Sequence, residues 1–388
     1  MALLVLITIL LLLASSVVIT NFTESRLAET QKNSTTAASL NMVRDALLGQ
    51  LILNTSSMGY LPLPDLGTIG LLNPEGVSSG DFPGNCIGCP VLGKLPWRTL
   101  GIGPVRDASA SCLWYAVSGR FKSVPSPSPA SVLNWDSWEY DSYDGASGRL
   151  QLADSAGNIW PGFYAALLVA PGEALVEQDQ GRDLNETVPE CGGNYNARNY
   201  LDPWNPAPPG NYTNYFPGSV NNRVAATATD KVFNLAINEV NNDRLLGVTA
   251  LEIFDITLQS RLRSLLLSSQ LSGPGFIVAG PKGTDNLTCS DRFCINWRDH
   301  LFVTNINPPT PVTVDGLLTA NCKRVVIFSG ARTGTQVRAT AADRNLISNY
   351  LEGTNASSFS TPTAAGTFVG FSSYQTGNRA RDIVHCIA

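Results

Sequence analysis

The sequence predicts an α+β protein in which a long N-terminal helix packs on a loop-rich, mainly antiparallel β body that disulfides cross-link. Three observations support this fold class. The stretch from Met1 to Phe22 carries no charged side chain, and neither glycine nor proline occurs before Gly49. The rest of the chain contains 34 glycines, 24 prolines and 8 cysteines. Turn-forming residues at this density indicate short strands joined by many loops.

Residues 1–22 are predicted to cross a membrane once. About 20 apolar residues in a helix span the hydrocarbon core of a bilayer. A cleaved signal peptide is the alternative, but it needs a basic start, a shorter apolar core and a small-residue cleavage site. Here no lysine or arginine precedes Arg26, and the apolar run is too long. We therefore expect a single-pass membrane anchor.

The same helix is predicted to continue to residue 54 and to become amphipathic. Leu40, Val43, Leu47 and Leu51 are spaced by three and four residues, which places them on one face of a helix. We expect this second half of the domain 1–54 to pack on the body.

Composition and charge narrow the classes of function. The 388 residues suffice for one large or two ordinary domains beyond the helix, and only 15% of them are charged. The net charge is −5 and no basic stripe is present, so we expect no nucleic-acid partner. The two histidines, His300 and His385, lack the spacing of metal ligands or of a nucleophile–base pair. We expect the protein not to be an enzyme.

The cysteines indicate an oxidising compartment, since an exported body meets conditions in which thiols pair. Eight cysteines allow 105 connectivities. Short spacing favours Cys289–Cys294, and Cys86–Cys89 is a second candidate that closes a small, strained ring. Half of a zinc site is the alternative for Cys86 and Cys89, but the spacing of Cys289 and Cys294 does not match a zinc ribbon.

The body is divided by prediction into residues 55–122 and a larger α+β part, 123–388. Within the larger part, residues 163–202 and residues 324–355 contain the same short pattern of residue types in the same order. A strand ends at Gly172 or Gly330, a glutamine follows six residues later, and an Asn-Tyr-Leu triplet comes after it. We interpret this as two copies of one strand–loop unit. Between the copies, Thr249 and Glu252 form a capping box that begins a helix extending to about Leu271.

These features resemble type IV pilins and type II secretion pseudopilins. The start from Ala2 to Ile7 (ALLVLI) is similar to that of minor members. Further blocks are similar to those of large bacterial prepilin-like proteins, namely residues 46–49 (ALLG), 59–65 (GYLPLPD), 93–101 (GKLPWRTLG), 113–117 (LWYAV) and 242–247 (NDRLLG). Leu63 is a departure, because relatives often have cysteine there, and their disulfide pattern is not transferred.

The resemblance implies a role in filament assembly for Met1 and Val5. Most pilins carry glutamate at the fifth mature position, where it is thought to pair with the N-terminal amine of a neighbouring subunit. With Met1 as the first residue, that position is Val5. Its apolar side chain implies a minor subunit, placed at the tip or priming position of a type IV pilus or type II secretion-like filament. The expected partners are other pilin or pseudopilin subunits and the bacterial inner membrane, with the body in the periplasm or, after assembly, outside the cell.

A calcium site is the one cofactor that the residues suggest. Asp141 and Asp144 lie in the acidic stretch 136–145, and carboxylate oxygens from short loops are typical calcium ligands. Some pseudopilins bind calcium, which adds to this expectation by resemblance.

Two alternatives to a filament subunit remain. One is an adhesin or ligand-binding protein on the same anchor, with Trp135, Trp138, Tyr195 and Tyr215 as candidate contact residues. The other is a eukaryotic membrane glycoprotein, because the chain contains Asn-x-Ser/Thr sequons, among them the one at Asn355.

Overall fold

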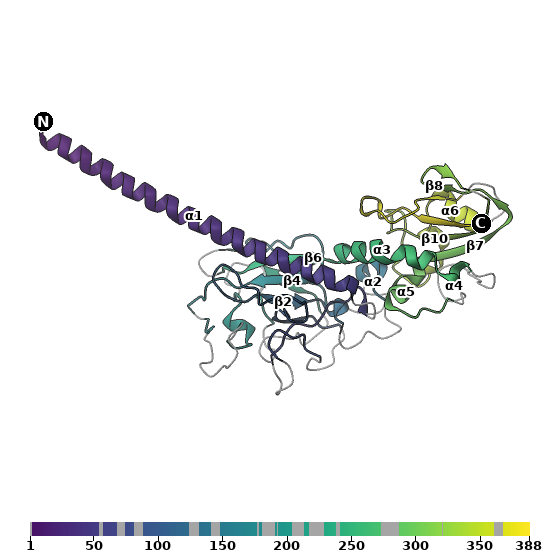
Figure 1. Cartoon of the computed structure of the whole chain (residues 1–388), viewed down its shortest axis with the longest axis horizontal. Coiled ribbons are helices and arrows are strands. Elements are labelled where there is room, and N and C mark those ends of the chain that lie inside the picture. Colours follow the sequence, from purple (N-terminus) through teal and green to yellow (C-terminus); the bar gives the residue numbers. More distant parts are fainter. Residues whose placement is uncertain are drawn as a thin grey trace.

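The computed structural model consists of an extended helix and two lobes (Figure 1). The first lobe contains the elements from α1 to β6 and the second those from α3 to β12. The structure describes side chains from Arg26 onward and the backbone of residues 2–53, 57–67, 74–80, 88–123, 132–140, 148–176, 178–180, 191, 193–203, 213–216, 229–237, 241–272, 287–319, 321–360 and 368–388.

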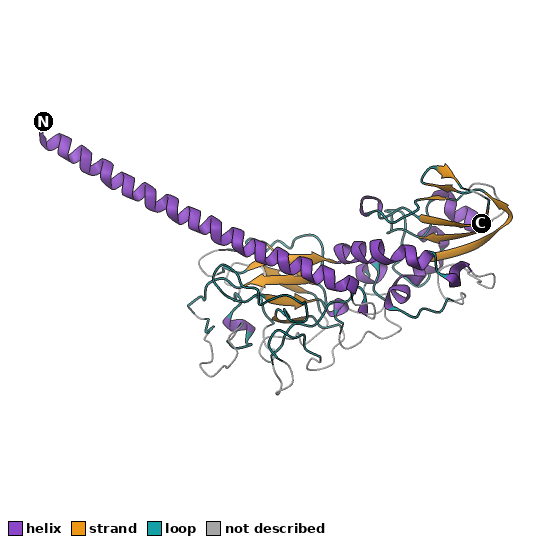
Figure 2. Cartoon of the chain, viewed as in Figure 1, coloured by secondary structure: helices purple, strands orange, loops and turns teal. Residues whose placement is uncertain are grey.

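Helix α1 extends from Ala2 to Leu53 and matches the range that the sequence predicts. Its N-terminal part projects away from both lobes, and its C-terminal part lies across a sheet (Figures 1 and 2). The predicted apolar face is confirmed, because Val43 and Leu47 are fully buried and Leu40 and Leu51 nearly so. The sheet thus supports only one half of the helix.

Within the part of the chain that the structure describes, no helix is both long and apolar enough to cross a membrane.

The first lobe contains a six-stranded sheet whose central strand is β4. β4 pairs antiparallel with β2 along one edge and with β6 along the other, while β3 and β5 pair in parallel at the far end. The strands are β1 (Val91–Lys94), β2 (Trp114–Val117), β3 (Leu150–Ala153), β4 (Tyr164–Ala170), β5 (Lys231–Asn234) and β6 (Arg244–Thr249).

The helices that follow β6 connect the two lobes. The capping box is present, since the Glu252 amide donates to Thr249 Oγ1 at 3.2 Å and the Thr249 amide donates to Glu252 Oε2 at 2.7 Å. The predicted end at Leu271 is wrong, because α3 stops at Leu266 and a turn precedes α4. The α-helices here are α2 (Trp135–Glu139), α3 (Ala250–Leu266), α4 (Ser269–Ser272) and α5 (Arg292–Trp297).

The second lobe contains two three-stranded sheets and one further α-helix. β10 is central in the larger sheet, between β7 and β12, and all its pairs are antiparallel. In the smaller sheet β8 pairs in parallel with β11. The elements are β7 (Leu301–Thr310), β8 (Thr313–Val314), β9 (Leu317–Leu318), β10 (Cys322–Phe328), α6 (Gly353–Ser360), β11 (Val369–Gly370) and β12 (Ile383–Ile387).

The second lobe repeats the central elements of the first in the same chain order. Each lobe has a preceding helix, α1 or α3, and a central antiparallel trio of strands, β2–β4–β6 or β7–β10–β12. Both central strands alternate in the same way. Leu168 and Val326 face the core beneath the helices, whereas Val169 and Ile327 face a separate outer core. The repeated pattern in 163–202 and 324–355 therefore corresponds to a repeated strand order and to the same direction of the side chains on the two central strands.

The loops of the two lobes correspond as well. Gln178 accepts the Leu175 amide at 2.9 Å, and Gln336 accepts the Thr333 amide at 3.0 Å. Each Asn-Tyr-Leu triplet begins at the end of a 3-10 helix, η3 (Ala197–Asn199) or η7 (Ile347–Asn349), and its tyrosine and leucine enter the outer core.

An asparagine occupies the same place in both lobes. Asn214 accepts the Asn234 amide at 2.7 Å and donates to the Asn234 carbonyl at 3.2 Å. Asn355 makes the same two bonds to Val369, at 2.8 and 2.7 Å. The unit that recurs is therefore a complete small fold, with a helix on one face of a sheet and a loop on the other.

The predicted α+β class is confirmed. The sheets are mixed instead of purely antiparallel, because the β3–β5 and β8–β11 pairs are parallel. Three disulfides cross-link the described parts of the lobes.

We predict that Leu47→Ala lowers the free energy of unfolding by about 2–5 kcal/mol, because it opens a cavity where α1 meets the sheet. Leu27→Ala is the matched control. Leu27 is 70% exposed on the projecting part of α1, so a change under about 0.5 kcal/mol is expected. Equal losses in a denaturant titration of both variants would show that α1 does not depend on this packing.

Candidate functional site

The projecting part of α1 is the first candidate site, because it contains the predicted assembly residues. Met1 lies outside the described residues, and Val5 lies in the helical backbone whose side chains are not described. From Arg26 to Thr35 the side chains are exposed except that of Asn33, which is half-buried. This part of the helix is therefore open to other molecules except on the side that faces the first lobe.

A cavity of about 230 Å³ lies where α1 leaves the first lobe. Its lining joins α1 to three loops of the lobe and includes Glu29, Lys32, Asp107, Glu173, Asn242 and Arg244. Lys32 forms an ion pair with Glu173 at 2.6 Å, but both side chains are more than half exposed. Water and salt screen such a surface pair, so it contributes little to the stability of the fold.

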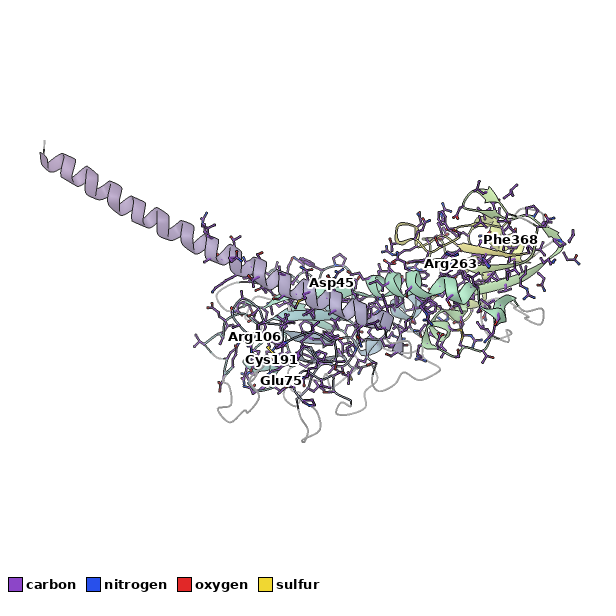
Figure 3. The ribbon with its side chains drawn as sticks, in the orientation of Figure 1. Asp45, Glu75, Arg106, Cys191, Arg263 and Phe368 are labelled. Carbon is purple, nitrogen blue, oxygen red and sulfur yellow. A yellow bond between two sulfur atoms is a disulfide. The ribbon has the colours of Figure 1, made fainter. Side chains whose placement is uncertain are left out.

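Stronger contacts fasten the next turns of α1. The Ala108 amide donates to Thr36 Oγ1 at 3.2 Å, and Ser39 Oγ donates to the Arg106 carbonyl at 2.8 Å. Further along, Arg44 pairs with Glu252, the residue that caps α3. α1 is thus joined to both lobes, and Figure 3 shows Arg106 in the first lobe and Arg263 in the second on either side of this joint.

The predicted calcium ligands Asp141 and Asp144 lie outside the described residues. Two other acidic residues of the same stretch form ion pairs, Asp136 with Arg338 and Glu139 with Arg332. Over the residues whose side chains are described, no group of three or more histidine, cysteine or acidic residues is placed to hold a metal ion.

The structure brings together Cys289 and Cys294 in a disulfide, as their short spacing predicts. Cys89 is also disulfide-bonded, while Cys86 lies outside the described residues. Long-range pairing joins Cys112 to Cys191 and Cys322 to Cys386. Sequence reasoning had no signal for these two pairs, since partners 79 and 64 residues apart meet only in the fold.

A second candidate site is a buried polar cluster between α2 and the second lobe. His300 Nδ1 lies 2.9 Å from Ser329 Oγ, and His300 Nε2 lies 3.5 Å from Asp136 Oδ2. Arg338 donates to Asp136 Oδ1 at 3.3 Å. Each of these four residues is at most 1% exposed.

Burial dominates the electrostatics of this cluster. It raises the pKa of Asp136 to about 6, against the opposing effect of the Arg338 charge. It also lowers the pKa of His300 well below its ordinary value, and Arg338 acts in the same direction. At neutral pH the cluster therefore consists of a neutral imidazole and an Asp136–Arg338 ion pair.

The order serine, histidine, aspartate is the order of a hydrolase triad, but the surroundings differ from those of an active site. The His300 ring packs against Trp135, Trp297 and Phe328. A nucleophile has to reach a substrate, and Ser329 is 0% exposed. We conclude that this cluster positions α2 against the second lobe and that its geometry is that of a structural joint.

The candidate adhesive aromatics are largely in the core. Trp135, Trp138 and Tyr215 are 6%, 9% and 8% exposed, so their predicted role as exposed contacts is wrong. Tyr195 is half-buried and donates its hydroxyl to Asp65 at 3.0 Å. Aromatic rings bury large apolar areas, and the fold uses them for that purpose.

Comparison with protein-family models, with curated proteins and with solved structures returns no match to this chain.

We predict that Arg338→Met lowers the free energy of unfolding by about 3 kcal/mol at pH 7, because it leaves the Asp136 carboxylate buried without its counter-charge. The loss should shrink at pH 5, where Asp136 takes up a proton. Arg332→Met is the control, since the Arg332–Glu139 pair is partly exposed and a change under about 1 kcal/mol is expected. Thermal unfolding at the two pH values measures both, and a pH-independent loss in Arg338→Met contradicts this account.

Proposed function

We propose that this protein is a minor pilin or pseudopilin subunit of a type IV pilus or type II secretion-like filament. The observation that carries the proposal is helix α1. It has 52 residues, and its apolar first half projects from the body while its second half is packed against a sheet (Figure 1). An ordinary membrane anchor leads into a flexible stalk, whereas this helix continues rigidly into the core.

The proposed mechanism is assembly by transfer of the apolar half-helix. Residues 1–22 lie in the bacterial inner membrane before assembly, and the lobes lie in the periplasm. During assembly this segment leaves the lipid and packs against the same segment of other subunits. Apolar side chains make comparable contacts in the bilayer and in the filament core. Close packing between helices, and not removal from water, therefore determines whether the segment leaves the membrane.

Two features favour the tip or priming position. Val5 provides no charge for pairing with a neighbouring N-terminal amine, so one contact of a regularly repeated subunit is missing. The chain also carries two copies of the helix-and-sheet unit on a single projecting helix. A subunit with two such lobes per helix is too bulky to repeat along the wall of a filament, and the end of a filament avoids this conflict.

One of the sequons on which the glycoprotein alternative rests is buried in the fold. Asn355 is 2% exposed, and its Nδ2 donates to Val369 and to Asp382. A glycan attached to this nitrogen would remove one of these two hydrogen bonds and would have to enter a buried site.

An adhesin remains the second candidate function, and one surface favours it. Strand β9 presents Leu317 and Leu318 at 73% and 71% exposure. It belongs to the second lobe, which lies away from the start of α1 (Figure 1). Binding of the purified chain to cells or glycans, lost on changing both leucines to serine, would support it.

We predict that the protein is recovered with bacterial membranes and copurifies, in few copies, with filaments made by the same cells. Leu10→Arg should abolish both, because a charge at the centre of the apolar helix costs about 2.5–3.5 kcal/mol in a bilayer. Leu27→Arg is the control, since Leu27 is exposed beyond the apolar segment. Quantitative immunoblots of membrane and sheared-filament fractions measure the effect. Recovery of the unaltered chain in the soluble fraction, or in membranes without filament proteins, contradicts the proposal.

A further inference from the structure

Two buried carboxylates face each other in the first lobe, where the loop after η3 meets the start of β6. Asp202 is 2% exposed and Asp243 is 1% exposed. The Asp202 amide donates to Asp243 Oδ2 at 2.8 Å, and the Asp243 amide donates to Asp202 Oδ2 at 2.8 Å. This reciprocal pairing holds the two acidic groups side by side.

Each carboxylate has one oxygen without a hydrogen-bond donor. Asp243 Oδ2 also accepts from Asn214, and Asp202 Oδ2 also accepts from the Asn242 amide. Their Oδ1 atoms are both buried and accept no hydrogen bond from any residue that the structure describes. Neither carboxylate takes part in an ion pair with those residues.

The charged groups that the structure describes near the pair do not neutralise it. Asp107, on the loop before β2, adds a third acidic group whose charge acts on Asp243. Arg244, on β6, and Lys32, on α1, line the cavity at the root of α1, where Lys32 is paired with Glu173. The side chains of β5 and its neighbouring loop that reach the site, Asn214 and Asn234, are neutral.

Two buried carboxylates that are linked by reciprocal amide bonds do not both stay ionised without a cation, since the repulsion and the loss of hydration are too large. One proton removes the repulsion and provides the missing donor for an orphan oxygen. We propose that Asp202 and Asp243 hold one proton between them, which makes the junction of the η3 loop and β6 a pH-sensitive joint. This property belongs to the folded lobe and is independent of the assembly role.

The sign of the effect follows from burial. Burial is the main cause that raises the pKa of both groups, and the charge of Asp202 raises that of Asp243 further. The folded protein therefore keeps a proton that the unfolded chain, with aspartate pKa values near 4, has released. The stabilisation is complete below about pH 4 and is lost as the pH rises through the raised values, about 7 for Asp202.

The second lobe provides an internal control at the equivalent position. Asp382 Oδ1 accepts the Gly330 amide at 3.4 Å, and its Oδ2 accepts the Glu352 amide at 2.9 Å and Asn355 at 2.8 Å. Glu352 replaces Asp202 there, and its side chain turns outward to pair with Arg381 at 3.5 Å. The second lobe thus has the buried aspartate without an orphan oxygen, and burial, together with the charge of Glu352, raises the pKa of Asp382 to about 6.

The joint lies next to the root of α1. Asn242, whose amide donates to Asp202, also lines the cavity that α1 shares with the first lobe. Loss of the proton therefore loosens a segment in direct contact with the place where the helix leaves the body.

Asp243→Asn tests the proposal in the full chain, kept in solution with a mild detergent. The new amide provides the hydrogen that the proton would supply, so the variant should match the unaltered protein at pH 5 and melt at a higher temperature at pH 9. The number of protons released on unfolding, taken from the pH slope of the unfolding constant between pH 5 and 7, should fall by about one. Should Asp243→Asn fail to fold, Asp202→Asn makes the same test from the other side.

Asp382→Asn is the matched control. All of its oxygen contacts come from N–H donors, so the amide should lower the melting temperature at both pH 5 and pH 9. Burial raises the pKa of Asp382 to about 6, so at pH 7.5 that carboxyl has lost its proton. An infrared band of a protonated carboxyl at pH 7.5 that Asp243→Asn removes and Asp382→Asn retains would support the proposal. Equal pH slopes in the unaltered protein and Asp243→Asn would overturn it. Stabilisation of chelator-treated protein by calcium, lost in Asp243→Asn, would assign the pair to a metal ion and overturn the proton assignment.

Discussion

The packing of α1 on the inner face of β4 is the contact on which the rest of this structure depends. Leu47 on the helix and Leu168 on the strand belong to one hydrophobic core, which continues beneath α3 to Val326 of the second lobe. Burial of this apolar area is the dominant favourable contribution to folding. Because the same core also receives α3, the two lobes and the extended helix form one connected body.

Repetition explains the size of that body. Each lobe uses a helix on one face of an antiparallel trio and a loop with an Asn-Tyr-Leu triplet on the other. The copies diverge in their polar groups. The second lobe satisfies Asp382 with N–H donors alone, whereas the first places Asp202 beside Asp243 and leaves two oxygens without donors. The second lobe therefore shows that this place in the fold does not require a buried carboxyl pair.

The polar cluster around His300 shows that a serine–histidine–aspartate arrangement does not by itself make an active site. Asp136, His300 and Ser329 follow one another within hydrogen-bonding reach or close to it, yet aromatic side chains enclose the imidazole completely. Burial keeps the histidine neutral, and the charge of Arg338 favours the ionised form of Asp136. The imidazole and the ion pair together position α2.

The sequence by itself determined the elements whose signals are local. Charge-free residues and the absence of glycine and proline predicted α1, the spacing of Leu40, Val43, Leu47 and Leu51 predicted its buried face, and Thr249 with Glu252 predicted the start of α3. Only the tertiary structure decided which distant residues meet. Cys112 with Cys191, Asp202 with Asp243, and Asp136 with Arg338 are brought together by strand pairing and core packing, and no periodicity in the sequence records those long-range contacts.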